Sequence, residues 1–320
     1  MPPTAPSATG RRTPWQALPP HVHAAVADIL GAPVTHATTQ PGGFSPGTAA
    51  RVRTATGDRA FVKAVSALTN AKSPEFHRRE ARHAAALPST VPAPRLLGTY
   101  DDGTWVALVF EDVPGRQPHI PWRRPELRRV LDAVTDLARA LTPSPLPDAP
   151  LAEDLLAPEF SGWQRLLEQQ DPDGLDPWIA GRLPHLAELA APWPDAVRGD
   201  TLAHGDLRAD NMLLTDDDRV VFVDWPHVLR GAHWLDLLIM LPCVRAQSGP
   251  DPEELFTTHP LGREADPAAV TAALAGLAGY FVHASLQPPP PGIPTVRAFQ
   301  RAQGEAALEW LRARTPALNG

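Results

Sequence analysis

The sequence reads His204-Gly205-Asp206-Leu207-Arg208-Ala209-Asp210-Asn211 near the end of its second third, and this stretch decides how the whole chain is interpreted. It continues as Met-Leu-Leu-Thr, three aspartates, and then Arg-Val-Val-Phe-Val-Asp224. Two short apolar runs on either side of acidic turn residues are typical of a β-hairpin. Because a hairpin returns to the edge from which it started, Asn211 and Asp224 are expected to meet there. An amide oxygen and a carboxylate at one edge can bind a hard cation such as Mg²⁺.

This pairing leaves Asp206 available to act on a substrate. A hydroxyl that attacks the γ-phosphorus of a nucleotide must lose its proton, and a carboxylate within hydrogen-bonding distance accepts the proton and aims the nucleophile. Each of these residues alone is most often a turn or capping residue. The string His-x-Asp-x-x-x-x-Asn, followed by an apolar strand pair that ends in Asp, is the arrangement of kinase catalytic and metal-binding loops. The sequence therefore predicts Asp206 as catalytic base and Asn211 and Asp224 as ligands of Mg²⁺.

Length and composition are those of a folded chain with two lobes. The 320 residues exceed one average domain, and 43% hydrophobic with 20% charged residues is ordinary for a globular protein. The net charge of -7 gives no electrostatic footprint for nucleic acid, which is not expected as a partner. Cys243 is the single cysteine, which excludes an internal disulfide and is expected to be a small buried hydrophobe. The sequence carries no signal for an oligomeric state.

Membrane association and export are not expected either. We find no apolar run that approaches the roughly 18 residues needed to span a bilayer. The start of the sequence has Pro and Arg where a signal peptide needs an apolar region. The predicted localisation is therefore cytoplasmic.

The pattern along the chain predicts an α+β fold. Residues 1–20, rich in Pro, Thr and Ala, are expected to form a flexible tail. Residues 21–112 are predicted to form an antiparallel, β-rich lobe, because short β-branched runs alternate with turn signals. Residues 113–320 are predicted to be mainly helical apart from the hairpin. Helices are expected at 21–30, 73–87 (with Ser73 as N-cap), 126–141, 160–170, 177–191, 233–246, 267–286 and 295–314.

The first lobe has features of a nucleotide site. Lys63 is a single charge in the apolar run Phe61–Val65, which is costly unless it faces a polar cleft or a partner. Glu80 lies on the inward stripe of its predicted helix and needs a partner as well, so the two are expected to pair. The alternative is a lysine at the strand edge that reaches solvent. Gly42 and Gly43 lie in a loop between strands that can bring backbone amides against phosphates, although such glycines are also common in plain hairpin connections.

The motif His204-Gly205-Asp206-Leu207 with Asn211, together with the later Asp224-Trp225, resembles the aminoglycoside phosphotransferase family, a branch of the protein-kinase-like fold. The resemblance extends over nearly the whole chain. It implies a two-lobed fold with ATP, or GTP as the alternative, and Mg²⁺ in the cleft. It also implies that His204 packs behind the catalytic loop and that Asp236 braces it.

In the first lobe the resemblance implies that Lys63 holds the α- and β-phosphates and that Glu80 fixes Lys63. It places Glu111 and Val113 at the hinge, where main-chain groups meet the adenine. Arg208 lies where many kinases carry a lysine that neutralises the γ-phosphate, so it is a second candidate catalytic residue, the alternative being a solvated surface arginine. Asp-Phe-Gly is replaced by Asp224-Trp225-Pro226 and no Ala-Pro-Glu follows, which disfavours a protein substrate.

The predicted function is transfer of the γ-phosphoryl group of ATP to a hydroxyl of a small molecule. An aminoglycoside-like acceptor is favoured, with a macrolide or a small amino alcohol as alternatives, because fold and catalytic loop do not determine the acceptor pocket. The alternative from another class is a nucleotide-binding regulatory pseudokinase. Such a protein would be expected to lack at least one of four residues that are all present here: Lys63, Asp206, Asn211 and Asp224. Two acidic clusters would suit a polycation, the alternative being that they are solvated loop charges. They are Asp171, Asp173 and Asp176, and Asp251, Glu253 and Glu254.

Overall fold

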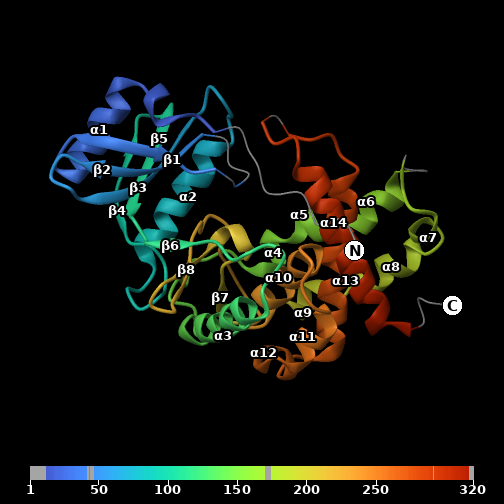
Figure 1. Ribbon diagram of the computed structural model, residues 1–320. Coiled ribbons are helices and arrows are strands. Elements are labelled where there is room, and N and C mark those ends of the chain that lie inside the picture. The colour runs from blue at the N-terminus through green and yellow to red at the C-terminus, as the bar shows by residue number, and fades with distance from the viewer. Residues whose placement is uncertain (1–11, 42, 44–46, 170–173, 291, 317–320) are drawn as a thin grey trace.

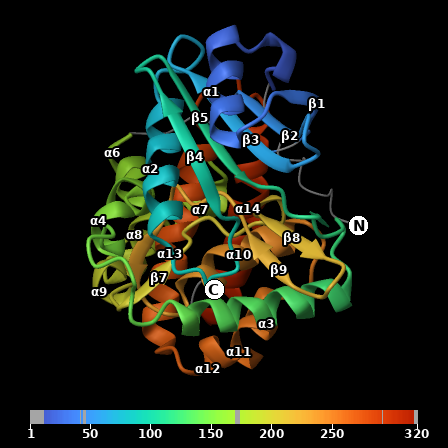
Figure 2. The ribbon, with the colours of Figure 1, turned by 90° about the vertical axis from the view of Figure 1, so that its left-hand side faces the viewer.

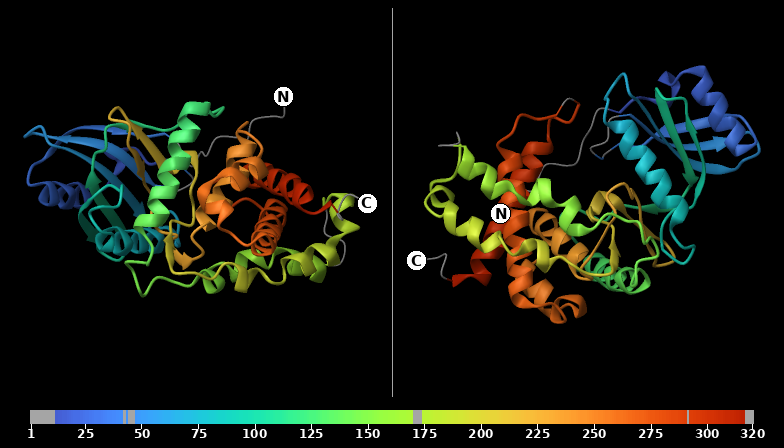
Figure 3. Two further views of the ribbon diagram at one scale, coloured as in Figure 1. Left: turned by 90° about the horizontal axis from the view of Figure 1, so that it is seen from below. Right: turned by 180° about the vertical axis from the view of Figure 1, so that it is seen from behind.

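A computed structural model gives the structure of the chain, and it describes residues 12–41, 43, 47–169, 174–290 and 292–316. The chain forms two lobes that lie side by side (Figures 1 and 3). The first is built on an antiparallel sheet and the second is mainly helical, which confirms the predicted α+β fold. The sheet ends at Glu111, next to the predicted lobe boundary at residue 112.

The N-lobe sheet has the strand order β1-β2-β3-β5-β4, with all neighbours antiparallel. One face packs on α1 and the short helix η1 through a core that includes Val22, Val26 and Val62. The other face packs on α2, which lies toward the C-lobe (Figure 1). The elements are η1 (Trp15–Ala17), α1 (Pro20–Leu30), β1 (Val34–Thr39), β2 (Thr48–Thr54), β3 (Arg59–Ser66), α2 (Ser73–Ala86), β4 (Leu96–Asp101) and β5 (Trp105–Glu111).

The prediction of a flexible tail over residues 1–20 is wrong for the part that the structure describes. Trp15 and Leu18 are buried at 7% and 4% exposure in the N-lobe core. The backbone N–H of Thr13 donates to the Gly47 carbonyl at 3.0 Å, and the Thr48 hydroxyl donates to the Thr13 carbonyl at 2.9 Å. Burial of two large apolar side chains outweighs the Pro-rich composition of this segment. Residues 1–11 lie outside the described residues.

The C-lobe is organised around α13 (Pro267–Ser285), which packs against α6, α8, α9 and α14. Figure 3 shows α13 and α14 lying against each other. The remaining elements are β6 (Gly115–Arg116), α3 (Arg124–Ala140), α4 (Ala152–Leu155), α5 (Ala157–Phe160), α6 (Gly162–Glu168), α7 (Pro177–Ala180), α8 (Leu183–Ala190), α9 (Trp193–Ala196), β7 (Thr201–Ala203), η2 (Ala209–Asn211), β8 (Met212–Thr215), β9 (Val220–Phe222), β10 (Leu229–Gly231), α10 (Leu235–Ala246), α11 (Pro252–Thr258), α12 (Pro260–Arg263) and α14 (Val296–Arg314).

Two predicted helices are each divided in two. The range 160–170 holds the end of α5 and then α6, and a Cβ added at Gly162 would lie 2.1 Å from the Gly279 carbonyl oxygen. Only glycine therefore fits at the first residue of α6, where it packs against the backbone of α13. The range 177–191 holds α7 and α8, because Pro184 has no N–H for a continuous helix and takes a position in the first turn of α8. The other predicted helices are confirmed within two residues.

Ser73 is the first residue of α2 and not its N-cap, which is Lys72. The Asn70 side-chain oxygen accepts the backbone N–H groups of Lys72 and Ser73, at 3.0 and 3.1 Å. The side chain of Asn70 therefore takes part in the start of α2, a role that we expected of Ser73.

Helix α13 is long and apolar enough to cross a membrane by length and composition, contrary to our expectation that no segment is. In the structure 67% of that stretch is buried. The apolar composition is accounted for by its central position in the C-lobe core, where neighbouring helices surround it.

The predicted hairpin between Asn211 and Asp224 is confirmed as β8 and β9, which pair antiparallel in a small sheet with β6. Figure 2 shows the hairpin beside α3 and below the N-lobe sheet. A second pair, β7 with β10, leads into the catalytic loop. The hairpin and this pair place the catalytic loop at the base of the cleft between the lobes.

Candidate active site

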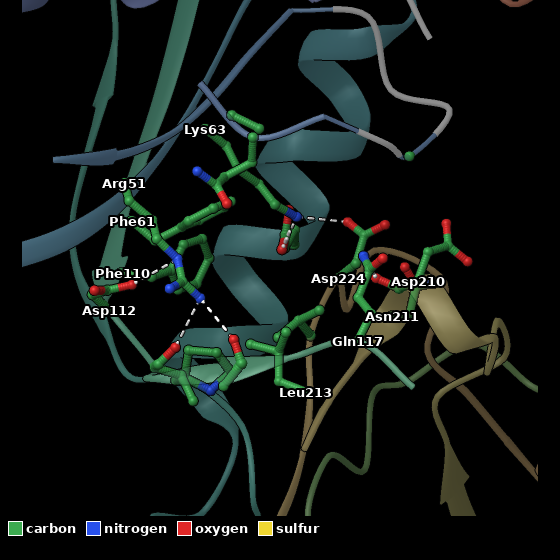
Figure 4. Close-up of a pocket in the computed structure, with 18 of the residues that line it drawn as sticks. Arg51, Phe61, Lys63, Phe110, Asp112, Gln117, Asp210, Asn211, Leu213 and Asp224 are labelled. Atoms are coloured by element: carbon green, nitrogen blue, oxygen red, sulfur yellow. Dashed lines mark hydrogen bonds and ion pairs between the residues drawn. The ribbon is translucent and has the colours of Figure 1, made fainter. Parts of the chain in front are cut away.

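A cavity of about 420 Å³ lies between the lobes, and residues from both lobes line it (Figure 4). Lys63 reaches into it from β3, while Asn211 and Asp224 reach it from the two ends of the β8–β9 hairpin. Sites for small molecules and cofactors commonly have volumes of about 300 to 1,000 Å³. The cavity is therefore large enough for a nucleotide.

Lys63 binds two carboxylates at once. Its Nζ atom is 2.6 Å from Glu80 Oε1 and 2.6 Å from Asp224 Oδ1. Glu80 is only 3% exposed and comes from α2, whereas Asp224 comes from the C-lobe. The expected pairing of Lys63 with Glu80 is confirmed, and the same ammonium also joins the two lobes across the cleft. A lysine that reaches solvent is excluded by this geometry.

The two carboxyl groups that share the Lys63 ammonium, Glu80 and Asp224, have pKa values shifted in opposite directions. Burial raises the pKa of Glu80 to about 7, since Lys63 offsets the burial only in part. For Asp224 burial acts in the same direction, but the charge and hydrogen bond of Lys63 outweigh it and the pKa is lowered. Asp224 is thus the carboxylate that stays ionised at the mouth of the cleft, and Lys63 stays protonated.

Asp206 and Asn211 contact each other within the catalytic loop. The Asn211 side-chain N–H group donates to the Asp206 main-chain carbonyl at 2.8 Å and to its Oδ2 at 3.2 Å. Because the amide nitrogen is used in this way, the amide oxygen of Asn211 remains available toward the cavity that the residue lines. Burial raises the pKa of Asp206 and the nearby Arg208 counteracts it.

Arg208 is a part of this constellation and not a surface residue. Its guanidinium is 2.5 Å from Asp206 Oδ1, and it also donates to both carboxylate oxygens of Asp210 at 3.0 and 3.1 Å. Arg208 lines the large cavity and also a second cavity of about 200 Å³, into which Asp206 faces. It therefore lies at the boundary between the two spaces, beside the predicted base.

The catalytic loop is held from behind by buried polar groups, as expected. Asp236 accepts the backbone N–H groups of His204 at 2.8 Å and of Gly205 at 2.9 Å. His204 is fully buried, its Nε2 atom is 3.0 Å from the Val223 carbonyl, and its Nδ1 atom accepts the N–H of Asp206. This pattern needs the neutral ring, and burial lowers the pKa of His204 to about 4. The loop geometry therefore depends on a neutral histidine.

Two backbone positions of the site have left-handed conformations. Gly205 has φ 78°, and a Cβ there would be 2.3 Å from the His227 carbonyl oxygen, so only glycine fits. Asp224 has φ 72°, which is uncommon for a residue with a side chain. Such strain is found where a carboxylate must be aimed at a ligand.

At the predicted hinge, Arg51 occupies main-chain carbonyl groups that a nucleotide could otherwise contact. Its Nη2 atom donates to the Val113 and Gly115 carbonyls at 3.1 and 3.2 Å, and Asp112 pairs with its Nε atom. The carbonyl of Val113 is thus already hydrogen-bonded. Glu111 lines the cavity and its N–H donates to the Arg95 carbonyl at 3.0 Å. Figure 4 shows Arg51 near the apolar side chains Phe61, Phe110 and Leu213, which line the same cavity.

Arg51 was not among the residues picked out from the sequence. It lies between the buried residues Ala50 and Val52 of β2, an environment like that which identified Lys63, although the strand also carries the exposed Arg53. Gly43 lines the large cavity, whereas Gly42 lies outside the described residues.

Apart from residues of the catalytic loop, the second cavity is lined by residues that no sequence motif predicted. It lies between α5, α13, α14 and the catalytic loop, and its polar side chains include Glu159, Tyr280 and Gln300. The Gln300 amide donates to the Tyr280 hydroxyl at 3.2 Å. Glu159 is an exposed residue, but the protein atoms around its carboxyl group and the charge of Asp206 raise its pKa to about 7.

Those members of the two acidic clusters that the structure describes do not line either cavity. Asp176 caps α7 and Asp251 caps α11, in each case by accepting backbone N–H groups. Glu253 accepts from Trp310 and Arg314. Asp171 and Asp173 lie outside the described residues. The side chains of Asp176, Asp251 and Glu253 therefore have structural partners.

Two lobes with a nucleotide-sized cleft, a lysine bridged to a glutamate, and a loop with an aspartate and an asparagine define the class of kinase-like phosphotransferases. A model of the phosphotransferase enzyme family (APH) matches residues 37–288, and the chain belongs to this family. It is a small-molecule phosphotransferase that acts on hydroxyl groups. None of the curated proteins matches the chain at a significant level.

Solved structures share the fold at low sequence identity. A thermostable mutant of aminoglycoside phosphotransferase APH(4)-Ia, in a ternary complex with ADP and hygromycin B, is 16% identical, with a TM-score of 0.60 over 91% of this chain and 98% of the other. Choline kinase LicA from Streptococcus pneumoniae is 14% identical, with a TM-score of 0.59 over 92% and 98%. Spectinomycin phosphotransferase APH(9)-Ia, in complex with ADP and spectinomycin, is 10% identical, with a TM-score of 0.58 over 89% and 97%.

Proposed function

We propose that the chain transfers the γ-phosphoryl group of ATP, bound with Mg²⁺, to a hydroxyl group of a small alcohol. The observation that carries this proposal is the position of Asp206 and Arg208. Asp206 faces the smaller cavity, and Arg208, which pairs with it at 2.5 Å, lines both cavities. A nucleotide in the larger cavity and an alcohol in the smaller one would meet at this pair.

The donor set at the hairpin fits Mg²⁺. The cation commonly takes one or two protein carboxylates and completes its shell with water and phosphate oxygens. The residues that would hold it are Asp224, through its carboxylate, and Asn211, through its amide oxygen. No cluster of three His, Cys, Asp or Glu side chains suited to a metal occurs in the described part of the chain, in keeping with a site that depends on phosphate ligands. When bound, Mg²⁺ neutralises charge on the transferring phosphoryl group.

The other roles follow from the contacts of each residue. Lys63, positioned by Glu80, would bind phosphate oxygens in the larger cavity. Asp206 would accept the proton of the acceptor hydroxyl. Burial raises the pKa of Asp206, which makes its carboxylate a stronger base. Arg208 would hold the Asp206 carboxylate in place and present positive charge toward the phosphoryl group. All these groups are present together, which argues against a regulatory protein without catalysis.

The acceptor that the smaller cavity favours is a small alcohol with a single positively charged amino group. Its volume of about 200 Å³ is below the range of about 300 to 1,000 Å³ that holds drug-sized ligands. Glu159 is the carboxylate in it besides Asp206, and aromatic rings surround it. An ammonium group would lower the raised pKa of Glu159 and pack against the rings. Among the predicted acceptors this favours an amino alcohol over an aminoglycoside or a macrolide.

A panel of acceptors tests the proposal. The panel would contain short amino alcohols, their neutral isosteres, aminoglycosides and a macrolide, each offered with ATP or GTP and Mg²⁺. Turnover would be followed by release of the nucleoside diphosphate and by ³¹P NMR of the phosphomonoester. We expect the highest kcat/KM with an amino alcohol and ATP. Absence of a phosphorylated product with every acceptor would refute the function, and preference for a tri-amino sugar would refute the small-cation assignment.

A further inference from the structure

We propose that Arg12 binds the phosphate chain of the nucleotide, so that the segment before η1 is a part of the nucleotide site. This inference rests on the proposed function, because it needs a nucleotide in the larger cavity. Arg12 lines that cavity on the N-lobe side, together with Gly43 and Thr48. Lys63 and Asp224 line the same cavity. The predicted site residues did not include Arg12.

The backbone that carries Arg12 is anchored on the N-lobe sheet. Arg12 forms a parallel β-bridge with Gly47, and the next residue, Thr13, is hydrogen-bonded to Gly47 and to the Thr48 side chain. Trp15 is buried only three residues further along, and its carbonyl lies 2.9 Å from a ring nitrogen of His23. The position of the arginine is therefore determined by core packing and not by a loose chain end.

The guanidinium lies against the glycine-containing loop. A Cβ placed on Gly43 would be 2.6 Å from Arg12 Nη2, so glycine at 43 makes room for the arginine side chain. Gly43 has φ 74°, a conformation that side chains rarely adopt. The close approach of Gly43 and the guanidinium places a cation at the wall of the cavity that both residues line.

Arg12 faces carboxylates in a cleft that is proposed to bind phosphate. Burial lowers the pKa of Arg12, whereas the carboxylates of Asp224 and Asp210 support its charge. Those two carboxylates belong to the side of the cleft that would hold Mg²⁺ and Arg208. Once Mg²⁺ and a nucleotide enter, the phosphates would replace the carboxylates as the anions that face Arg12. A planar guanidinium matches two phosphate oxygens at once, which an ammonium does not.

Direct binding measurements test this role without relying on turnover. Adenosine and ADP would be titrated calorimetrically into the wild type, Arg12→Ala, Arg12→Lys and, as a matched control, Arg53→Ala, which removes an exposed arginine from β2. We expect Arg12→Ala to weaken ADP binding about 10- to 100-fold, the range for a hydrogen bond to a charged group, and to leave adenosine binding unchanged. Arg12→Lys should be intermediate, and Arg53→Ala should match the wild type.

The possible results separate the two proposals. Equal affinity of the wild type and Arg12→Ala for ADP would overturn the role of Arg12 and leave the proposed function intact. A parallel loss of adenosine and ADP affinity in Arg12→Ala would also overturn it, since it would show that the arginine supports the sheet and not the phosphates. Failure of the wild type to bind ADP would overturn the nucleotide site itself. In turnover assays KM for ATP should rise in Arg12→Ala while KM for the acceptor stays constant.

Discussion

Lys63 and Asp224 are 161 residues apart in the sequence, and yet Lys63 Nζ lies 2.6 Å from Asp224 Oδ1. Lys63 belongs to the central part of the N-lobe sheet and Asp224 to the end of the C-lobe hairpin. Glu80 holds the other side of the same ammonium at 2.6 Å. The relative position of the two lobes therefore determines whether the phosphate-binding lysine and the proposed metal ligand are aligned. The predictions below follow from this relationship and from the two cavities beside it.

The Lys63–Glu80 pair should be visible in stability. Lys63→Met leaves the buried Glu80 without its counter-charge, which we expect to lower the free energy of unfolding by about 3 to 5 kcal/mol. Burial already raises the pKa of Glu80 to about 7 although Lys63 lowers it, so in the variant the pKa is higher still, and the loss becomes smaller as falling pH protonates the carboxyl. Urea unfolding at pH 6 and pH 8 measures both effects. The double variant Lys63→Met/Glu80→Gln should recover much of the loss at pH 8, and equal stability of the two variants would contradict the pairing.

Loss of the catalytic base should reduce turnover without unfolding the chain. Asp206→Asn keeps the size of the side chain but cannot accept the hydroxyl proton, so we expect kcat to fall about 10²- to 10⁴-fold. The control is Asp216→Asn, which changes an exposed aspartate in the turn of the hairpin. Steady-state kinetics with the preferred acceptor and circular dichroism measure activity and folding. An unchanged kcat in Asp206→Asn would show that another group accepts the proton.

The proposed metal role of Asp224 predicts a change in magnesium dependence. In Asp224→Asn the cation loses a charged ligand. Loss of a residue that only supports a metal ligand costs roughly 10- to 100-fold in metal affinity. Loss of the ligand itself should therefore raise the Mg²⁺ concentration for half-maximal rate by more than this. Asn211→Ala should act in the same direction but less, because a neutral ligand is lost. The measurement is a Mg²⁺ titration at saturating ATP. The same half-maximal concentration in wild type and Asp224→Asn would remove Asp224 from the metal site.

The acceptor cavity predicts a pH dependence with a definite sign. The pKa of Glu159 is raised to about 7, so the carboxyl is neutral below that pH and negatively charged above it. A cationic acceptor should therefore bind more tightly, with a lower KM, as pH increases through 7, until its own amine loses its proton. Glu159→Gln should abolish this inflection and leave KM high throughout. The control Glu188→Gln changes an exposed glutamate on α8 and should keep the wild-type profile.

Local sequence patterns were sufficient for the elements of the site that depend on neighbouring residues. The hairpin between Asn211 and Asp224 follows from two apolar runs and an acidic turn, and the structure confirms it. The pairing of Lys63 with Glu80 follows from two charges on inward-facing positions, each of which needs a partner. Patterns of this kind are legible because period and burial are local properties of a strand or a helix.

Other predictions failed where distant contacts outweigh local composition. The Pro-rich start was expected to be a tail, but Trp15 is buried in the N-lobe core and brings Arg12 to the cleft. The continuous helices expected at 160–170 and 177–191 are divided, and Gly162, at the start of α6, lies directly against the α13 backbone. The burial of Trp15 and the packing of Gly162 cannot be read from a single segment, since each depends on which surface that segment meets, whereas Pro184 in the range 177–191 is visible in the sequence.

The sequence by itself determined the two lobes, the catalytic loop and the identity of the charged groups, because these depend on periodicity, turn chemistry and a spaced motif within single segments. Only the tertiary structure decided that Arg208 holds Asp206 between two cavities and that Lys63 reaches Asp224 across the lobes. It also decided the acceptor cavity, whose polar residues Glu159, Tyr280 and Gln300 come from three separate helices. Side chains that converge from distant elements are set by helix packing, and no local pattern encodes that convergence.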